Sequence, residues 1–391
     1  MSKVETTWMR SGALGLIAAA WLAGPAIGAE RSETLKFDGS ALEVENLAGS
    51  VQLRPAEGRD FVVEATIVAA DAELLDRIEF RTDTAGTRKR LRVAYPTDDY
   101  KVFIYQPGEG QSGRSQVRYM GKKVTVTSSS RRSGAEVHVD LVVHVPADSS
   151  LKLDNHVGGI QGDNIHADMR LDSSSGLISI ENSRGELSAD TGSGSIRVVE
   201  HRGRVSADTG SGSVEMDNVL GDVDADTGSG SVMLRAITGN VVADTGSGRV
   251  ELEDILADRI VVDTGSGGVT ALRIRGAFEA DTGSGSVRVS DFEAGEKIKV
   301  DTGSGRIELS GNMAAVRQLD LDTGSGGVDI QASELPSMQL KVSAGSGGIE
   351  VQVPDMHMVR SGDGFLEATL GDGSGRGRID TGSGGIRIRK L

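Results

Sequence analysis

The stretch GRVSADTGSGSVEMDNVLGDVDADTGSGSV (residues 203–232) decides the fold, because it repeats one short pattern without a slip. Glycine recurs every nine residues from Gly203 to Gly230, and each glycine precedes two apolar residues in alternation, such as Val205 and Ala207. Alternation with a period of two predicts a strand that is buried on one face. Each nine-residue unit is therefore predicted to form one short strand and one glycine turn.

A second repeat is twice as long. The pentapeptide Asp-Thr-Gly-Ser-Gly begins at nine aspartates: Asp190, Asp208, Asp226, Asp244, Asp263, Asp281, Asp301, Asp322 and Asp380. The step is 18 residues from Asp190 to Asp244 and then 19, 18, 20 and 21, and degenerate copies begin at Ser343 and Ser361. Self-similarity at this length, without helical periodicity, predicts an all-β fold, a β-solenoid with about 18 residues per coil. Three hexapeptides would fill a coil equally well, but the glycine spacing favours two nine-residue units.

The remaining sequence predicts three segments. Residues 1–29 have a basic start, a short apolar run and small residues before Glu30, which predicts a signal peptide. Residues 30–150 alternate less regularly and are predicted to form a small β cap region with an inserted loop at 106–117. Residues 151–391 are predicted to form the solenoid, in which the charged strand Ile386–Lys390 would be the last layer.

Composition narrows the function classes. The chain has no cysteine, which excludes disulfides and thiolate metal sites, and only 3% of its residues are aromatic. The formal net charge of -15 argues against nucleic acid as a partner. No second long apolar run follows the predicted signal peptide, so the mature chain is expected to lack a transmembrane helix and to be exported, in the periplasm, secreted or at the cell surface.

The pentapeptide also has the sequence of an aspartic protease loop. Such enzymes bring two aspartates together across a cleft, whereas nine copies at this spacing predict a column along one face. We expect the aspartates to point outward at strand ends and to cap the following glycine turns. Alternatively, Asp190, Asp208, Asp226 and Asp244 hold Ca²⁺ between coils, although Gly212 stands where calcium nonapeptide repeats need aspartate. Ca²⁺ is the only cofactor that the sequence suggests.

One segment, 88–132, combines aromatic and basic residues in this acidic chain. Its predicted binding residues are Tyr95, Tyr100, Tyr105, Tyr119, Arg114, Arg118, Lys122 and Lys123. Aromatic and arginine side chains are enriched at binding surfaces. The alternative is that the tyrosines pack inside the cap and the basic residues are merely solvated.

Two stretches carry a family resemblance: VDLVVHVPADSSLKLDNHVGGIQGDN (139–164) and SSSGLISIENSRGELSADTGSGSIRV (173–198). They resemble exported bacterial proteins of unknown function known as putative adhesins, which have β-strand repeats. The resemblance covers most of residues 40–391. It implies a β-solenoid outside the cytoplasm, without known catalytic residues.

The sequence thus predicts a non-enzymatic scaffold or adhesion module of the cell envelope that binds an envelope protein or a glycan. Parallel β-helices can also carry polysaccharide lyases or hydrolases. Residues 307–375 depart from the strict repeat and would have to hold the catalytic groove of such an enzyme.

Overall fold

The computed structural model describes residues 28–85, 88–106, 113–128, 133–354 and 356–391. The predicted signal peptide at 1–29 lies almost entirely outside these residues. The chain divides into two compact units, residues 1–167 and 168–391. No helix in the described part of the chain is long and apolar enough to cross a membrane.

The first unit is a β structure with one short helix, α1 (Ala72–Asp76), whose first turn is capped by the side chain of Asp71. Its strands are β1 (Ala29–Phe37), β2 (Ala41–Ala48), β3 (Val51–Pro55), β4 (Phe61–Ala69), β5 (Glu79–Ala85), β6 (Arg88–Ala94), β7 (Val102–Ile104), β8 (Arg114–Tyr119), β9 (Lys122–Thr127), β10 (Ala135–Val145), β11 (Ser150–Val157) and β12 (Ile160–Asp163). The region predicted as a loop at 106–117 therefore includes the start of β8.

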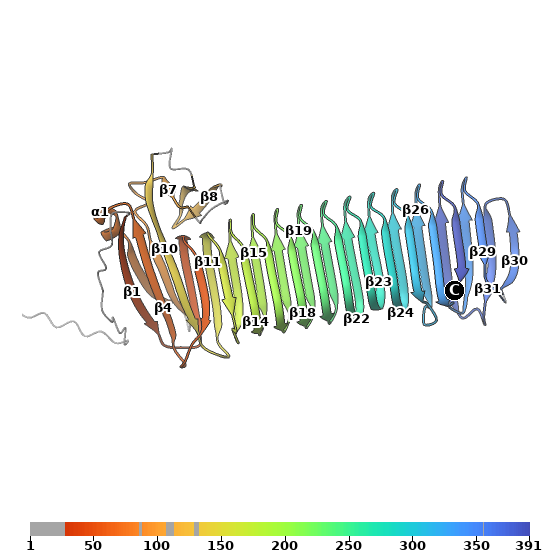
Figure 1. Ribbon diagram of the computed structural model, residues 1–391, viewed down its shortest axis with the longest axis horizontal. Helices are drawn as coiled ribbons and strands as arrows, with labels where there is room; N and C mark the ends of the chain where they lie inside the picture. The colour runs from red at the N-terminus through yellow and green to blue at the C-terminus, as the bar shows by residue number, and fades with distance from the viewer. Residues whose placement is uncertain (1–27, 86–87, 107–112, 129–132, 355) are drawn as a thin grey trace, which may run out of the picture. The chain divides into compact units, whose positions relative to one another are not determined.

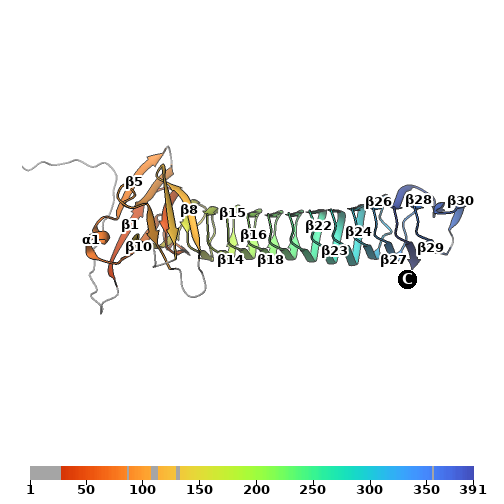
Figure 2. The same ribbon diagram turned by 90° about the horizontal axis from the view of Figure 1, so that it is seen from above.

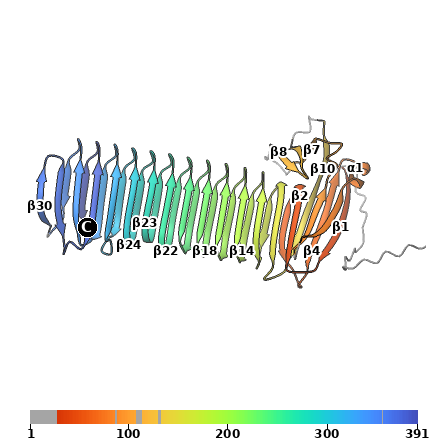
Figure 3. The same cartoon turned by 180° about the vertical axis from the view of Figure 1, so that it is seen from behind.

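Two kinds of pairing hold this unit together. Strands β1, β4 and β10 form an antiparallel sheet, whereas β2 pairs in parallel with β11 and β3 with β12. The parallel pairs give 41–55 and 150–163 the strand pairing of two stacked coils. Strands β7, β8 and β9 form a second, smaller sheet, in which β8 and β9 are an antiparallel hairpin (Figure 3).

The second unit is a β-solenoid, as predicted. Its strands are β13 (Asp168–Ser173), β14 (Ile178–Arg184), β15 (Leu187–Thr191), β16 (Ile196–Arg202), β17 (Val205–Thr209), β18 (Val214–Leu220), β19 (Val223–Thr227), β20 (Val232–Thr238), β21 (Val241–Thr245), β22 (Val250–Thr264), β23 (Val269–Thr282), β24 (Val287–Thr302), β25 (Ile307–Asn312), β26 (Gln318–Thr323), β27 (Val328–Glu334), β28 (Met338–Ala344), β29 (Ile349–Gln352), β30 (His357–Gly362), β31 (Phe365–Leu370), β32 (Gly375–Thr381) and β33 (Ile386–Lys390).

Each coil of the regular part has two strands, as the glycine spacing predicted. Short strands β15, β17, β19 and β21 stack in parallel in one sheet, and longer strands β14, β16, β18 and β20 stack in the other (Figure 2). The paired residues of each strand lie beside their equivalents one repeat later, so that Val205 lies beside Val223. The inward residues of both sheets are almost fully buried, which makes a narrow core of small apolar layers.

Threonine fixes the turn after each short strand, which corrects the prediction for aspartate. Thr209 is fully buried; its Oγ1 donates to the carbonyl oxygen of Gly194 at 2.8 Å and accepts from the backbone N–H of Gly212 at 3.1 Å. No hydrogen bond joins Asp208 to this turn among the described residues. The alternation of the strand explains the difference, because it turns Thr209 inward, next to the turn backbone, and Asp208 outward.

A left-handed residue recurs in the longer strands and was not predicted. Seven residues at the same position of successive coils have φ between 49° and 56°: Asn182, Glu200, Asn218, Ala236, Asp254, Arg273 and Asp291. In the regular coils this residue is skipped in the pairing, as in the ladder that joins Val199 to Asp217 and then His201 to Val219. The long strand therefore bends once in every coil.

The end of the solenoid does not follow chain order, so the prediction that Ile386–Lys390 is the last layer is wrong. Strand β33 pairs with both β27 and β29, and β32 pairs with both β26 and β28 (Figure 1). The degenerate repeat at Ser343 lies beside Asp380, but Ser361 belongs to β30 of an antiparallel hairpin with β31. The long segment between β29 and β32 lets the chain double back in this way.

Candidate binding surface

The outer face of the β8–β9 hairpin carries three exposed cations. Arg118 lies directly opposite Lys123 in the antiparallel ladder, and Arg114 lies opposite Thr127. Residues that face each other across such a ladder share a side of the sheet, and residues two apart on a strand do too. Arg114, Arg118 and Lys123 are exposed on that side, and none forms an ion pair with a described residue.

The other basic residues of the predicted segment are mostly neutralised. Lys122 points to the opposite side of the hairpin and pairs with Asp98. Lys89 pairs with Asp38 at 3.2 Å. Arg131 and Arg132 lie outside the described residues. Three of the cations in 88–132 that form no ion pair with a described residue therefore lie on the outer face of the hairpin, and the others are Arg88 and Lys101.

Three of the four tyrosines are buried, which corrects their assignment as binding residues. Tyr95, Tyr105 and Tyr119 are 4%, 6% and 0% exposed. The hydroxyl of Tyr95 donates to the carbonyl oxygen of Ala48 at 2.8 Å, and the rings of Tyr95 and Tyr119 pack edge to face. Burial raises the pKa of Tyr105 to about 12. In a chain with few aromatic residues, these three rings are part of the core of the first unit.

Tyr100 alone is half-buried at the surface. The guanidinium carbon of Arg77 lies 5.5 Å from the centre of its ring, a cation–π contact that a surface side chain readily makes. The ring of Tyr100 therefore already has a partner within the protein, the guanidinium of Arg77.

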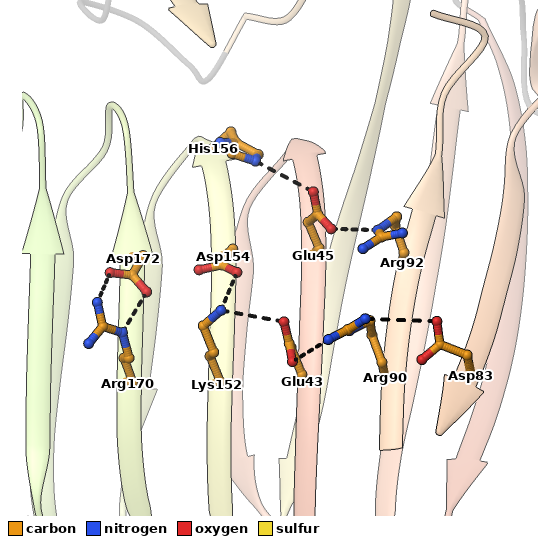
Figure 4. A network of polar contacts seen from close by, with 10 residues as sticks. All are labelled: Glu43, Glu45, Asp83, Arg90, Arg92, Lys152, Asp154, His156, Arg170 and Asp172. Atoms are coloured by element: carbon orange, nitrogen blue, oxygen red, sulfur yellow. Dashed lines mark hydrogen bonds and ion pairs between the residues drawn. The ribbon is translucent and has the colours of Figure 1, made fainter. Parts of the chain in front are cut away.

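A network of charges crosses strands β5, β6, β2 and β11 of the first unit (Figure 4). Arg90 and Lys152 hold the two oxygens of Glu43 at 3.2 and 3.4 Å. Arg92 and His156 contact Glu45 at 2.5 and 3.9 Å.

The carboxylates of this network are held in the charged form. Burial works to raise the pKa of Glu45, but the hydrogen bonds from His156 and Arg92 outweigh it and the pKa is lowered. The pKa of Glu43 is lowered in the same way, because Lys152 and Arg90 outweigh its burial. Paired carboxylates of this kind cannot supply a proton near neutral pH, so the network cross-links strands.

The alternation of charged and apolar residues in the sequence is a signal for this network. Glu43 and Glu45 alternate with Leu42 and Val44, and Arg90 and Arg92 alternate with apolar residues in the same way. Two strands with opposite charges in the same alternation are suited to pair side by side.

The four aspartates predicted to bind metal form a continuous outward column. Asp190, Asp208, Asp226 and Asp244 pair residue by residue in the ladder and are all exposed. Burial, and next the charge of Asp208, raises the pKa of Asp190; burial and then the charge of Asp244 raises that of Asp226. The described residues contain no group of three or more His, Asp or Glu that could hold a metal. Calcium binding here stays a prediction.

The irregular end of the second unit has an open groove, where the alternative hypothesis would place an enzyme. It is lined by turn glycines such as Gly327 and by charged residues including Asp329, Glu350 and Arg387. Arg387 contacts Asp329 at 3.4 Å and Glu350 at 3.0 Å. Since one guanidinium holds both carboxylates, neither is a free acid or base.

The geometry defines a β-solenoid with a β-rich N-terminal unit and a cationic hairpin. Residues 204–331 match the family model described as Toastrack DUF4097. This match confirms the family resemblance inferred from the repeats. No curated protein sequence matches the chain.

Solved structures of similar proteins have low sequence identity. A putative adhesin from Parabacteroides merdae is 11% identical, covers 72% of this chain and 96% of its own, and has a TM-score of 0.35. A putative cell adhesion protein from Clostridium sporogenes is 9% identical, covers 93% of this chain and 100% of its own, with a TM-score of 0.23. A putative lipid binding protein from Parabacteroides distasonis is 10% identical, covers 73% and 97%, and has a TM-score of 0.29.

Proposed function

We propose that the protein is an exported, non-enzymatic binding or adhesion module whose β8–β9 hairpin binds an acidic glycan of the cell envelope. The observation that carries the proposal is the unneutralised pair of Arg118 and Lys123, with Arg114 on the same face. The predicted signal peptide supports a role outside the cytoplasm.

The positive charges of Arg118 and Lys123 repel each other in the free protein. Like charges directly opposite in an antiparallel ladder destabilise the pair, and no described carboxylate compensates Arg118 or Lys123. An anionic ligand would remove this repulsion on binding. The hairpin therefore has a physical reason to favour a negatively charged partner.

The net negative charge of the protein limits which anionic partners can bind the hairpin. A net charge of -15 makes the rest of the protein repel any broad anionic surface such as a membrane or a duplex. A narrow acidic chain can contact the hairpin alone. Arg114 and Arg118 are four residues apart on one strand, about 13 Å, so one such chain could contact both.

The charges of the groove at the irregular end favour a binding protein over a lyase or hydrolase. A general acid needs a raised pKa and a general base needs a free carboxylate. Arg387 forms ion pairs with both Asp329 and Glu350, so neither carboxylate of the groove is without a partner.

The test is binding of acidic and neutral envelope polysaccharides to the wild type and to a triple variant, Arg114→Ser, Arg118→Ser and Lys123→Ser. The matched control is Arg197→Ser, Arg249→Ser and Arg306→Ser, which removes three exposed arginines from the second unit. We expect the hairpin variant to lose binding to acidic glycans and the control to retain it, with binding that weakens as salt increases. Equal binding by both variants would refute the proposal. Capture of an envelope protein, without any glycan, would replace the glycan with a protein partner.

A further inference from the structure

The groove at the irregular end of the second unit crosses three neighbouring layers of the solenoid. It is lined by Gly327, Gly385 and Gly348, which directly precede the adjacent strands β27, β33 and β29. Its volume is about 680 Å³, and ligand sites in proteins usually measure about 300–1,000 Å³. The groove is therefore large enough to hold a small ligand.

The walls of the groove are polar. They include two serines and four charged residues: Ser304, Ser325, Arg306, Asp329, Arg387 and Glu350. Asp329, Arg387 and Glu350 are neighbours in the ladder, and the side chains of Arg387 and Glu350 are each 49% exposed. The apolar residues Val328 and Ile386 also line the groove but are buried. A ligand in the groove would therefore contact polar groups and glycine backbone.

The glycines keep the space between these walls open, although the packing of the coils does not require all of them. A Cβ at Gly348 would meet nothing within 4 Å, and a Cβ at Gly385 would make only an ordinary contact at 3.4 Å. Neither glycine has a left-handed φ. The other coils, except at Gly268, carry a side chain at this position: Leu177, Ser195, Ser213, Ser231, Arg249, Ser286 and Arg306. The groove thus lies where three successive layers lack that side chain.

The charges of the walls select an uncharged ligand. Arg306 and Arg387 balance Asp329 and Glu350, so an ion in the groove would meet a like charge beside each opposite one. An apolar ligand would bury these groups without new partners, which is costly. A guanidinium has five N–H donors and a carboxylate about four acceptor sites, so both can form further hydrogen bonds in addition to their ion pairs. A sugar hydroxyl suits such walls because it donates and accepts at once.

We propose that this groove binds a neutral saccharide. Its hydroxyls donate to the carboxylates of Asp329 and Glu350 and accept from the guanidinium of Arg387, and its ring lies over the glycines. The inference goes beyond the acidic glycan proposed for the hairpin and uses none of the residues of that site.

The experiment is calorimetric titration of the predicted exported form, from Glu30 onward, with short neutral oligosaccharides of glucose, galactose, mannose and N-acetylglucosamine. We expect the wild type to bind at least one of them. Gly348→Leu should lose this binding, because its side chain fills the groove. Glu350→Ala should weaken it by about tenfold, the effect of losing a hydrogen bond to a charged group. Circular dichroism and the melting temperature show that each variant is folded.

Gly268→Leu is the matched control. It places the same side chain at the equivalent position of an earlier coil, where a Cβ would make only an ordinary contact at 3.4 Å. This variant should bind the sugar as the wild type does. Binding of none of these sugars by the wild type, or equal binding by Gly348→Leu and Gly268→Leu, would overturn the proposal.

Salt separates this site from the hairpin. Binding of a neutral sugar should not change as salt increases, whereas binding of an acidic glycan by the hairpin should weaken. The triple serine variant of the hairpin should bind the neutral sugar normally. Loss of neutral-sugar binding in that variant would assign the sugar to the hairpin and overturn the groove as its site.

Discussion

Thr227 Oγ1 donates a hydrogen bond to the carbonyl oxygen of Gly212, 15 residues earlier, at 2.7 Å. The same oxygen accepts from the backbone N–H of Gly230 at 3.0 Å. One hydroxyl thereby stabilises its own turn and also joins that turn to the preceding coil. The arrangement recurs at Thr209, Thr245, Thr264, Thr282, Thr302, Thr323 and Thr381.

Thr227→Val should destabilise the solenoid by about 1–3 kcal/mol, because it leaves the half-buried carbonyl of Gly212 and N–H of Gly230 without their hydrogen-bond partner. Chemical denaturation measures the change. Thr227→Ser keeps the hydroxyl and should lose much less. Asp226→Asn, at the exposed neighbour, should cost nothing. If Asp226→Asn were as damaging as Thr227→Val, the aspartate would be the residue that holds the turn after all.

Gly212→Ala should be strongly destabilising. A Cβ at this position would lie 1.7 Å from the carbonyl oxygen of Gly194, which belongs to the backbone of the preceding coil and cannot move aside cheaply. Gly348→Ala is the matched control, since its Cβ would meet nothing within 4 Å. The melting temperature should fall for the first variant and stay unchanged for the second. Equal melting temperatures would show that the stack is less tightly spaced than the structure indicates.

Ala236→Asn should stabilise the protein by about 0.5–1 kcal/mol. Ala236 has a φ of 51°, a left-handed conformation that costs a residue with a Cβ about 1–2 kcal/mol and that asparagine adopts more readily. Asn218 occupies the equivalent position one coil earlier. The midpoint of denaturation measures the gain, and Ala225→Asn, in the buried core, is the opposite control and should unfold the coil.

Most of the solenoid could be predicted because the period of the repeat is visible in each of its regular coils. Nine-residue glycine spacing implied two strands per coil, and alternation implied which side chains point inward. The left-handed residue of the long strands was not predicted, because its type varies from asparagine to arginine. Asn182 and Asn218 were a signal for it, since asparagine adopts this conformation more readily than most residues. The position of the last strand was predicted wrongly from chain order. Nothing in the sequence around Ile386 shows that β33 lies between β27 and β29.

The binding surface was predictable only in part. Composition identified the segment 88–132. The direction of each side chain depends on strand register, however, and register cannot be deduced from a local excess of aromatic and basic residues. Register separates Arg118 and Lys123 on one side of the hairpin from Tyr119 on the other. Replacing the tyrosines would therefore test the stability of the first unit, and replacing the cations tests binding.

His201 should make stability depend on pH. It is 1% exposed, and its Nε2 donates to the carbonyl oxygen of Gly185 at 3.0 Å while Nδ1 accepts from the hydroxyl of Ser183 at 2.8 Å. Both contacts suit the neutral ring, and burial lowers the pKa of His201 below its usual 6.5, although the Gly185 carbonyl opposes the shift.

The sign of the effect follows from this lowered pKa. Below pH 6.5 the unfolded chain binds a proton that the folded chain resists, so stability falls as the pH decreases through this range. The double variant Ser183→Ala with His201→Val places valine beside Val219 of the next coil. It should remove the part of the pH dependence of the free energy of unfolding that His201 causes. Denaturation of both proteins between about pH 7 and pH 5 measures it. Parallel pH profiles for the wild type and the double variant would show that His201 protonates freely in the folded state.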